Sequence, residues 1–147
     1  MTRVEEIHSS HMWAAVLAIP SLVMLAVAAS RPILGLRIGL GTAGGLMLAA
    51  ALMAGSGFRY VFTATGLEIS TLGYRLRSIA AGTIREYYPD RWNVAGGYGI
   101  RGLGASRAYV WGSQGVRIKI IDGEVFLGCH DPQAMIRNLD QLTRRTH

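Results

Sequence analysis

The sequence predicts an α+β membrane protein in two parts, a hairpin of two transmembrane helices followed by a soluble antiparallel β domain with a C-terminal capping helix. Two long uncharged segments lie before position 58, and the residues after it alternate between apolar and polar as strands do. An amphipathic pattern closes the chain. We therefore divide the 147 residues into an N-terminal part, 1–57, and a soluble domain, 58–147.

The first hydrophobic segment predicts a membrane-spanning helix over about 12–30. Residues 13–29 contain no charge, and a helix needs roughly 20 apolar residues to cross the hydrocarbon core. Pro20 lies inside this segment, which a membrane helix tolerates because neighbouring groups satisfy the freed carbonyl. The alternative is a cleavable signal peptide, since the small residues at 26–28 resemble a cleavage site.

The second hydrophobic segment predicts a helix over about 36–57, and the short link before it makes the pair an antiparallel hairpin. It contains the small-xxx-small spacing that lets two helices approach closely in lipid. Four glycines form this spacing: Gly35, Gly39, Gly41 and Gly45. We expect this glycine face to pack on the first helix of the same chain, with pairing between two copies of the chain as the alternative.

The chain is basic, with 15 lysines and arginines against 9 acidic residues and a net charge of +6. Such a surplus suits an acidic partner, either nucleic acid or the anionic leaflet of a membrane. Because the charge accompanies two hydrophobic segments, we expect the lipid bilayer as partner and no nucleic acid. The single cysteine, Cys129, cannot form an internal disulfide, so the sequence does not indicate an oxidising compartment.

The basic residues nearest the helix ends predict the orientation of the hairpin. The two terminal sides carry Arg3, Arg59, Arg75 and Arg77, and the link between the helices carries Arg31 and Arg37. Because the more positive side faces the cytoplasm, we expect a multi-pass protein of the cell membrane whose soluble domain is cytoplasmic.

Seven segments of the soluble domain alternate in the manner of strands: 59–63, 67–71, 74–79, 83–88, 107–111, 115–121 and 124–128. We expect Pro89 to end the fourth strand and a glycine-rich loop to follow it. The pair Asp122-Gly123 between the last two strands is a strong hairpin signal. The alternation also predicts that Arg75 and Arg77 share one face of the third strand.

The end of the chain predicts a helix that covers the sheet. Asp131 is placed to cap its N-terminus, and Pro132 fits the first helical position. Met135, Leu139 and Leu142 follow at i, i+4 and i+7, so they share one helix face. We expect that face to pack on the strands.

Short motifs of the soluble domain resemble a known family. They are residues 97–101 (GYGIR), 107–112 (RAYVWG), 115–119 (GVRIK), 122–123 (DG) and 127–132 (LGCHDP). Together with the two preceding helices, these motifs resemble the bacterial pleckstrin-homology-like (PH-like) domains of small membrane proteins, over about 58–142. The resemblance implies a bent antiparallel sheet or barrel whose open end is closed by the C-terminal helix, and it implies no catalytic residues.

Three patterns typical of catalysis or cofactors have simpler explanations. Residues 97–102 match G-x-G-x-x-G but lack the flanking strand and helix of a dinucleotide site, so the glycines indicate a loop or bulge with positive φ. Cys129, His130 and Asp131 are consecutive, and consecutive side chains rarely converge. His8 and His11 lack a third ligand. We expect no enzyme, no cofactor and no metal.

The remaining candidates for function are basic and aromatic residues of the soluble domain, which suit lipid phosphate or an acidic partner surface. These candidates are Arg75, Arg77, Arg101, Arg107, Tyr109 and Trp111. We expect a noncatalytic, membrane-anchored module that binds a protein partner, or a second copy of the chain, or assembles a membrane complex. The alternative is electrostatic binding of the anionic membrane surface or of lipid headgroups.

Overall fold

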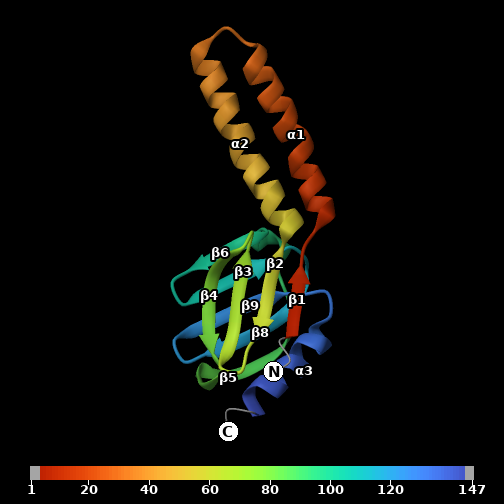
Figure 1. The fold of residues 1–147 in the computed structure, drawn as a ribbon, viewed down its shortest axis with the longest axis vertical. Coiled ribbons are helices and arrows are strands. Elements are labelled where there is room, and N and C mark those ends of the chain that lie inside the picture. Colours follow the sequence, from red (N-terminus) through yellow and green to blue (C-terminus); the bar gives the residue numbers. More distant parts are fainter. Residues whose placement is uncertain (1–3, 145–147) are drawn as a thin grey trace. The chain divides into compact units, whose positions relative to one another are not determined.

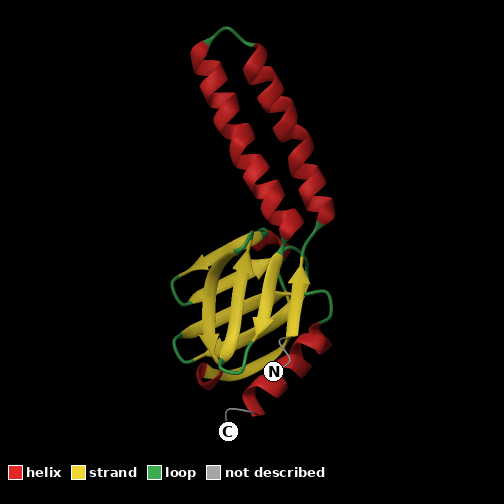
Figure 2. Ribbon diagram, in the orientation of Figure 1, coloured by secondary structure: helices red, strands yellow, loops and turns green. Residues whose placement is uncertain are grey.

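The structure is a computed structural model that describes residues 4–144 (Figures 1 and 2). Arg3, used above for the orientation, lies outside these residues. The described helices are α1 (His11–Ser30), α2 (Leu34–Ser56), α3 (Pro132–Arg144) and the short 3₁₀ turns η1 (Ala81–Thr83) and η2 (Val94–Gly96). The described strands are β1 (Val4–His8), β2 (Phe58–Phe62), β3 (Gly66–Thr71), β4 (Tyr74–Ala80), β5 (Ile84–Arg91), β6 (Gly99–Leu103), β7 (Ser106–Val110), β8 (Gln114–Ile120) and β9 (Gly123–Gly128).

The structure forms two compact units, and the first is the helix pair α1 and α2, residues 9–56. Both helices are long and apolar enough to cross a membrane, with mean hydropathies of 2.2 and 1.7 over their most apolar windows. α1 continues through Pro20, and Ser10 caps its N-terminus by accepting a hydrogen bond from the backbone of Trp13.

The two helices meet along small residues, of which Ser21 and Ala28, and likewise Gly44 and Ala51, are spaced seven apart. The buried residues of this seam are Ser21 and Ala28 in α1 and Gly44, Ala51 and Ala54 in α2. A Cβ on Gly44 would lie 3.0 Å from Cγ of Leu25 and 3.1 Å from the carbonyl oxygen of Ser21, so a larger residue would require α1 to shift by a few tenths of an ångström.

The four glycines predicted for helix packing lie elsewhere on α2. A Cβ added at Gly35, Gly39, Gly41 or Gly45 would meet no atom of another residue within 4 Å. The expectation that these four positions pack on the first helix of the same chain is therefore wrong. The reason is helical phase: Gly44 takes the contact, and its neighbour Gly45 points about 100° away from it.

The second unit contains all the strands and α3, and its first sheet has the strand order β1-β2-β3-β4. β1 pairs with β2 in antiparallel fashion, with His8 opposite Phe58. The sequence predicts no strand before the helices and groups residues 1–57 with them, whereas the structure places Val4–His8 in the sheet. Along the sequence, the helix pair thus lies between β1 and β2, which are neighbours in one sheet (Figure 1).

A register shift separates the two arginines that the alternation placed on one face of β4. Arg77 is opposite Ile69, whereas Arg75 is opposite Ser70, the next residue of β3. Because successive residues of a strand point to opposite faces, the irregularity sends the two arginines in different directions. The prediction of a shared face is therefore wrong.

The second sheet has the order β5-β8-β9-β7-β6 and is mixed, because β7 and β9 run parallel. The expectation of purely antiparallel pairing is wrong for this pair. β5 continues through Pro89 to Arg91, contrary to the prediction that the proline ends the strand. Its position explains this, since β5 lies at a sheet edge, where a strand tolerates a missing N–H. β6, predicted to be loop, pairs with β7.

The core of this unit lies between the sheets, whose strands cross at a steep angle in Figure 2. Phe58 of the first sheet packs edge-on against Tyr109 of the second, with ring centroids 5.5 Å apart. α3 packs against β2, β5 and β8, so it contacts both sheets. As predicted, Asp131 caps α3 by accepting from two backbone N–H groups, and the predicted face is buried. That face is Met135, Leu139 and Leu142.

Candidate functional site

The face of the second sheet that points away from the core carries a row of cross-strand partners. Arg101, Ala108, Phe126 and Arg117 stand opposite one another on β6, β7, β9 and β8. The segment between β5 and β6 folds over this face, because Trp92 and Tyr98 pack against Ala108, Val110 and Phe126. β7 is therefore covered on both faces.

A cleft of about 300 Å³ opens beside this cover. Its lining combines aromatic side chains with guanidinium groups and comes from β6, β7, β8, β9 and the segment after β5. The lining residues are Trp92, Arg101, Gly102, Ser106, Arg107, Ala108, Arg117, Glu124 and Phe126. We call this the arginine cleft.

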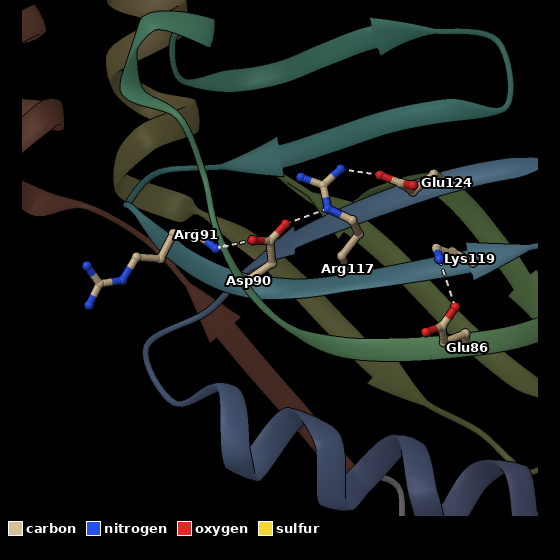
Figure 3. A network of polar contacts seen from close by, with 6 residues as sticks. All are labelled: Glu86, Asp90, Arg91, Arg117, Lys119 and Glu124. Carbon is tan, nitrogen blue, oxygen red and sulfur yellow. Dashed lines mark hydrogen bonds and ion pairs between the residues drawn. The ribbon is translucent and has the colours of Figure 1, made fainter.

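Arg117 is held in place within the arginine cleft by two carboxylates, as Figure 3 shows. Its Nε donates to Asp90 of β5, and its Nη1 donates to Glu124 of β9. The guanidinium also lies over the ring of Phe126, 5.6 Å from the centroid. Hydrogen bonding to Arg117 lowers the pKa of Asp90. Arg117 is thus paired and positioned before any ligand arrives, and the group that it forms with Asp90 and Glu124 carries a net charge of −1.

Arg101 and Arg107 differ from Arg117 because neither forms an ion pair with a carboxylate among residues 6–144. The guanidinium of Arg101 lies against Gly97, where a Cβ would come within 2.8 Å of it. Gly97 has φ +74°, and its carbonyl accepts from Trp92 Nε1 at 2.7 Å. The glycines of this segment therefore serve backbone conformation and close packing.

The arginine cleft has the chemistry of an anion-binding site. Guanidinium groups match the geometry of carboxylates and phosphates through two parallel hydrogen bonds. Arg101 and Arg107 supply positive charge that no carboxylate of the described chain neutralises, and Trp92 and Phe126 supply an apolar wall. Glu124, already bound to Arg117, adds no free base to the cleft.

The structure brings together only two of the six binding residues predicted from the sequence, Arg101 and Arg107. Arg75 lies on the first sheet and pairs with Glu68 at 3.4 Å. Arg77 donates to the carbonyl of Ala105 at 2.8 Å and so joins β4 to the turn between β6 and β7. Neither contributes to the arginine cleft.

Tyr109 and Trp111 are not available to a lipid or a partner, contrary to their prediction as binding residues. Their exposed fractions are 0% and 6%, and both pack on Phe58. Tyr109 lies in β7 and Trp111 directly follows it, and both side chains belong to the core. The sequence in turn misses Trp92 and Arg117, because their contacts depend on pairing between distant strands.

A second cavity of about 270 Å³ surrounds the end of β1. His8 is 3% exposed, and its Nε2 accepts from the backbone N–H of Trp111 at 3.3 Å. Its ring lies 4.8 Å from that of His130. Burial, with a smaller contribution from His130, lowers the pKa of His8 to about 4. His8 is thus neutral at physiological pH.

The cysteine beside this cavity is a poor nucleophile. Burial, aided by Glu6 and Asp131, raises the pKa of Cys129 to about 12, so it stays a thiol. Within residues 4–144, no three His, Cys, Asp or Glu side chains are grouped as metal ligands. His8 serves the core, and its predicted companion His11 belongs to α1.

Comparisons of the chain with models of protein families, with curated proteins and with solved structures gave no match.

Proposed function

We propose that this protein is a two-pass membrane protein whose noncatalytic, PH-like cytoplasmic domain binds acidic side chains of a partner protein through the arginine cleft. One observation carries the proposal: Arg101 and Arg107 line a concave site without any carboxylate partner among residues 6–144, next to a third arginine that is already paired. Such a site gains binding energy when a carboxylate arrives, because charge-assisted bidentate pairs are about twice as strong as neutral hydrogen bonds.

The pairing of β1 with β2 supports an even number of membrane crossings. The chain leaves the sheet after His8, forms α1 and α2, and returns at Phe58, directly opposite His8. If only one helix crossed the bilayer, two paired strands would lie on opposite sides of it. Cleavage of a signal peptide near residue 28 would likewise remove β1 from the domain. Two crossings agree with the length and hydropathy of both helices.

The stacked sheets and the C-terminal helix support the PH-like part of the proposal. α3 packs on strands of both sheets and so closes one end of the sandwich, as the resemblance implies. Two features depart from a plain antiparallel layout, the parallel pair β7 and β9 and the strand β1 that precedes the helices. The first departure changes the direction of one strand pair and the second adds a strand, and α3 still packs on both sheets.

The shape of the arginine cleft favours a protein partner over an isolated ion. Trp92 and Phe126 form an apolar wall that a phosphate ion would leave bare, whereas an acidic side chain flanked by apolar atoms would cover it. Interfaces of this kind are enriched in tryptophan and arginine. Membrane anchoring would confine the search for that partner to proteins at the same surface.

The proposal is tested by capture of partners from the native membrane. The full-length chain is extracted in mild detergent as wild type, as Arg101→Gln/Arg107→Gln and as Arg85→Gln/Arg91→Gln. The last variant is the matched control, because Arg85 and Arg91 are exposed on β5 and do not line the cleft. Copurifying proteins are quantified by mass spectrometry.

We expect recovery of a defined protein to fall at least about tenfold in the cleft variant, which corresponds to about 1.4 kcal/mol, and to remain unchanged in the control. Equal recovery in all three chains would overturn the role of the arginine cleft. If the wild type retains anionic lipid and no protein, and the cleft variant loses that lipid, the headgroup-binding alternative replaces the protein partner.

A further inference from the structure

The turn between β3 and β4 contains Leu72, the one non-glycine residue with a left-handed backbone among residues 4–144. Leu72 has φ 50° and the following Gly73 has φ 82°, and they are the two residues between the strands. Two-residue hairpin turns with positive φ at both positions strongly favour Asn-Gly or Asp-Gly. A leucine at the first position pays a steric penalty, because its Cβ approaches the following carbonyl.

Packing within the protein covers only half of this leucine. Its side chain is 50% exposed, and the neighbouring Tyr74 is 77% exposed. Exposure alone does not single out Leu72, since Leu103 is 90% exposed with an ordinary backbone. What distinguishes Leu72 is that a large apolar side chain is displayed outward from a position that other residues would fill at lower cost. Backbone strain of this kind is a reason to look for a function.

The turn is tied to the point where the chain leaves α2. The hydroxyl of Thr71, the residue before Leu72, donates to the carbonyl of Gly57 at 2.8 Å. Gly57 directly follows Ser56, the last residue of α2. The turn is therefore bonded to the first residue after α2, and the proposed topology puts the end of α2 at the membrane surface.

We propose that the β3–β4 turn is a membrane-interface anchor, in which Leu72 inserts among the lipid chains just below the headgroups while Tyr74 and Arg75 lie at headgroup level. Tyrosine suits that layer because its ring is apolar and its hydroxyl is polar. The side chain of Arg75 remains 67% exposed despite its ion pair with Glu68, so its guanidinium is accessible to phosphate. The inference rests on the membrane crossing of the proposed function and is independent of the arginine cleft.

The opposite end of the same strands provides an internal comparison. The turn between β2 and β3 displays Ala64 and Thr65, both exposed and neither a large apolar residue. β2 spans five residues between the two ends, which is roughly 17 Å at the usual rise per residue. A probe at Ala64 is therefore matched in exposure to one at Leu72 and differs in its separation from Gly57.

The test measures lipid contact at single labelled positions in the full-length chain. Cys129 is replaced by alanine, and Leu72→Cys, Ala64→Cys or Leu46→Cys then carries one environment-sensitive nitrobenzoxadiazole label. Leu46 lies in the middle of α2 and reports the membrane crossing itself. The chains are reconstituted in nanodiscs of phosphatidylcholine and phosphatidylglycerol, and quenching by lipids spin-labelled on their acyl chains is recorded.

We expect strong quenching at position 46 and quenching at position 72 about threefold above that at position 64. Of the two turn positions, only position 72 should show a blue-shifted emission. Equal quenching at 72 and 64, with position 46 quenched, would overturn the anchor and leave the membrane crossing intact. No quenching at position 46 would instead contradict the crossing on which the anchor rests.

A second pair of chains tests Leu72 without replacing it by the probe. The label is placed at Tyr74→Cys, and Leu72 is compared with Leu72→Asn. Asparagine fits the left-handed backbone, so this variant keeps the turn folded. We expect quenching at position 74 to fall about twofold in the asparagine variant, because the apolar contact with lipid is lost. Unchanged quenching would overturn the role of Leu72.

Discussion

The hydroxyl of Tyr60 donates a hydrogen bond to the carbonyl of Gly128 at 2.8 Å and thereby joins β2 of the first sheet to β9 of the second. Tyr60 is completely buried. Tyr60→Phe leaves this carbonyl without its partner, so we expect the free energy of unfolding to fall by about 1–3 kcal/mol. Urea unfolding of the full chain in detergent micelles, followed by tryptophan fluorescence, measures this loss. Tyr74→Phe, at an exposed position, is the control and should leave stability unchanged.

The buried His8 predicts a loss of stability in acid. Its folded pKa of about 4 lies below the ordinary value of 6.5, so the unfolded chain binds the proton first as the pH falls. We expect the contribution of His8 to be complete above pH 6.5 and to be lost between about pH 6.5 and 4, by at most about 3 kcal/mol.

Glu6 acts in the opposite direction in the same cavity, because burial raises its pKa and the folded state then holds its proton more tightly. The contribution of His8 is therefore measured as the difference between wild type and His8→Gln at each pH. The glutamine oxygen can still accept from the N–H of Trp111. A difference in stability that does not vary between pH 7 and 5 would contradict the burial of a neutral His8.

The two cations that form ion pairs in Figure 3, Arg117 and Lys119, should differ in their effect on stability. Arg117 is 27% exposed, bonds Asp90 and Glu124 and covers Phe126. We expect Arg117→Gln to lower the free energy of unfolding by about 1–2 kcal/mol. Lys119 and Glu86 form an exposed pair on the same face, and Lys119→Gln should leave stability unchanged. Equal losses in the two variants, measured by urea unfolding in micelles, would contradict this ranking.

Adjacent glycines of α2 should respond differently to the same substitution. Gly44 packs against Leu25 and Ser21 of α1, whereas Gly45 faces open space. We expect Gly44→Val to destabilise the helix pair by about 1–3 kcal/mol through overpacking and Gly45→Val to have a much smaller effect. Unfolding of the chain by sodium dodecyl sulfate in mixed micelles measures both. A loss of dimers in Gly45→Val alone would indicate that the open glycine face binds a second copy.

Relief of backbone strain should make Leu72→Asn more stable than the wild type. Asparagine tolerates the left-handed conformation that costs leucine about 1 kcal/mol. We therefore expect the urea midpoint of the β domain to rise in micelles, while lipid contact of the turn falls in bilayers. A variant that loses both stability and lipid contact would show that the leucine has a structural role.

Local sequence patterns predicted the elements of this fold whose formation depends mainly on neighbouring residues. The two apolar helices, the strands after Phe58 and the capping of α3 by Asp131 follow from composition, alternation and capping chemistry. β1 could not be found in this way, because its five residues include two glutamates and its partner strand lies beyond both helices. The parallel pairing of β7 with β9 is equally non-local.

Only part of the candidate site could be predicted from the sequence, because the rest depends on which strands pair. Alternation reveals which residues of a strand share a face but not which face is covered. Tyr109 and Trp111 pack on Phe58 of the first sheet, so they are core residues and not binding residues. The charge of Arg101 and Arg107 predicts them as binding residues. The role of Arg117 depends on its ion pairs with Asp90 and Glu124 on neighbouring strands, which the sequence does not show.

The position of β1 also sets an order of assembly during synthesis. The ribosome makes Val4–His8 first, yet its pairing partner Phe58–Phe62 emerges only after both helices. The nascent strand therefore stays unpaired until both helices have been made. If α1 and α2 cross the bilayer as proposed, the first sheet is completed only after both have inserted, and folding of the domain then depends on insertion.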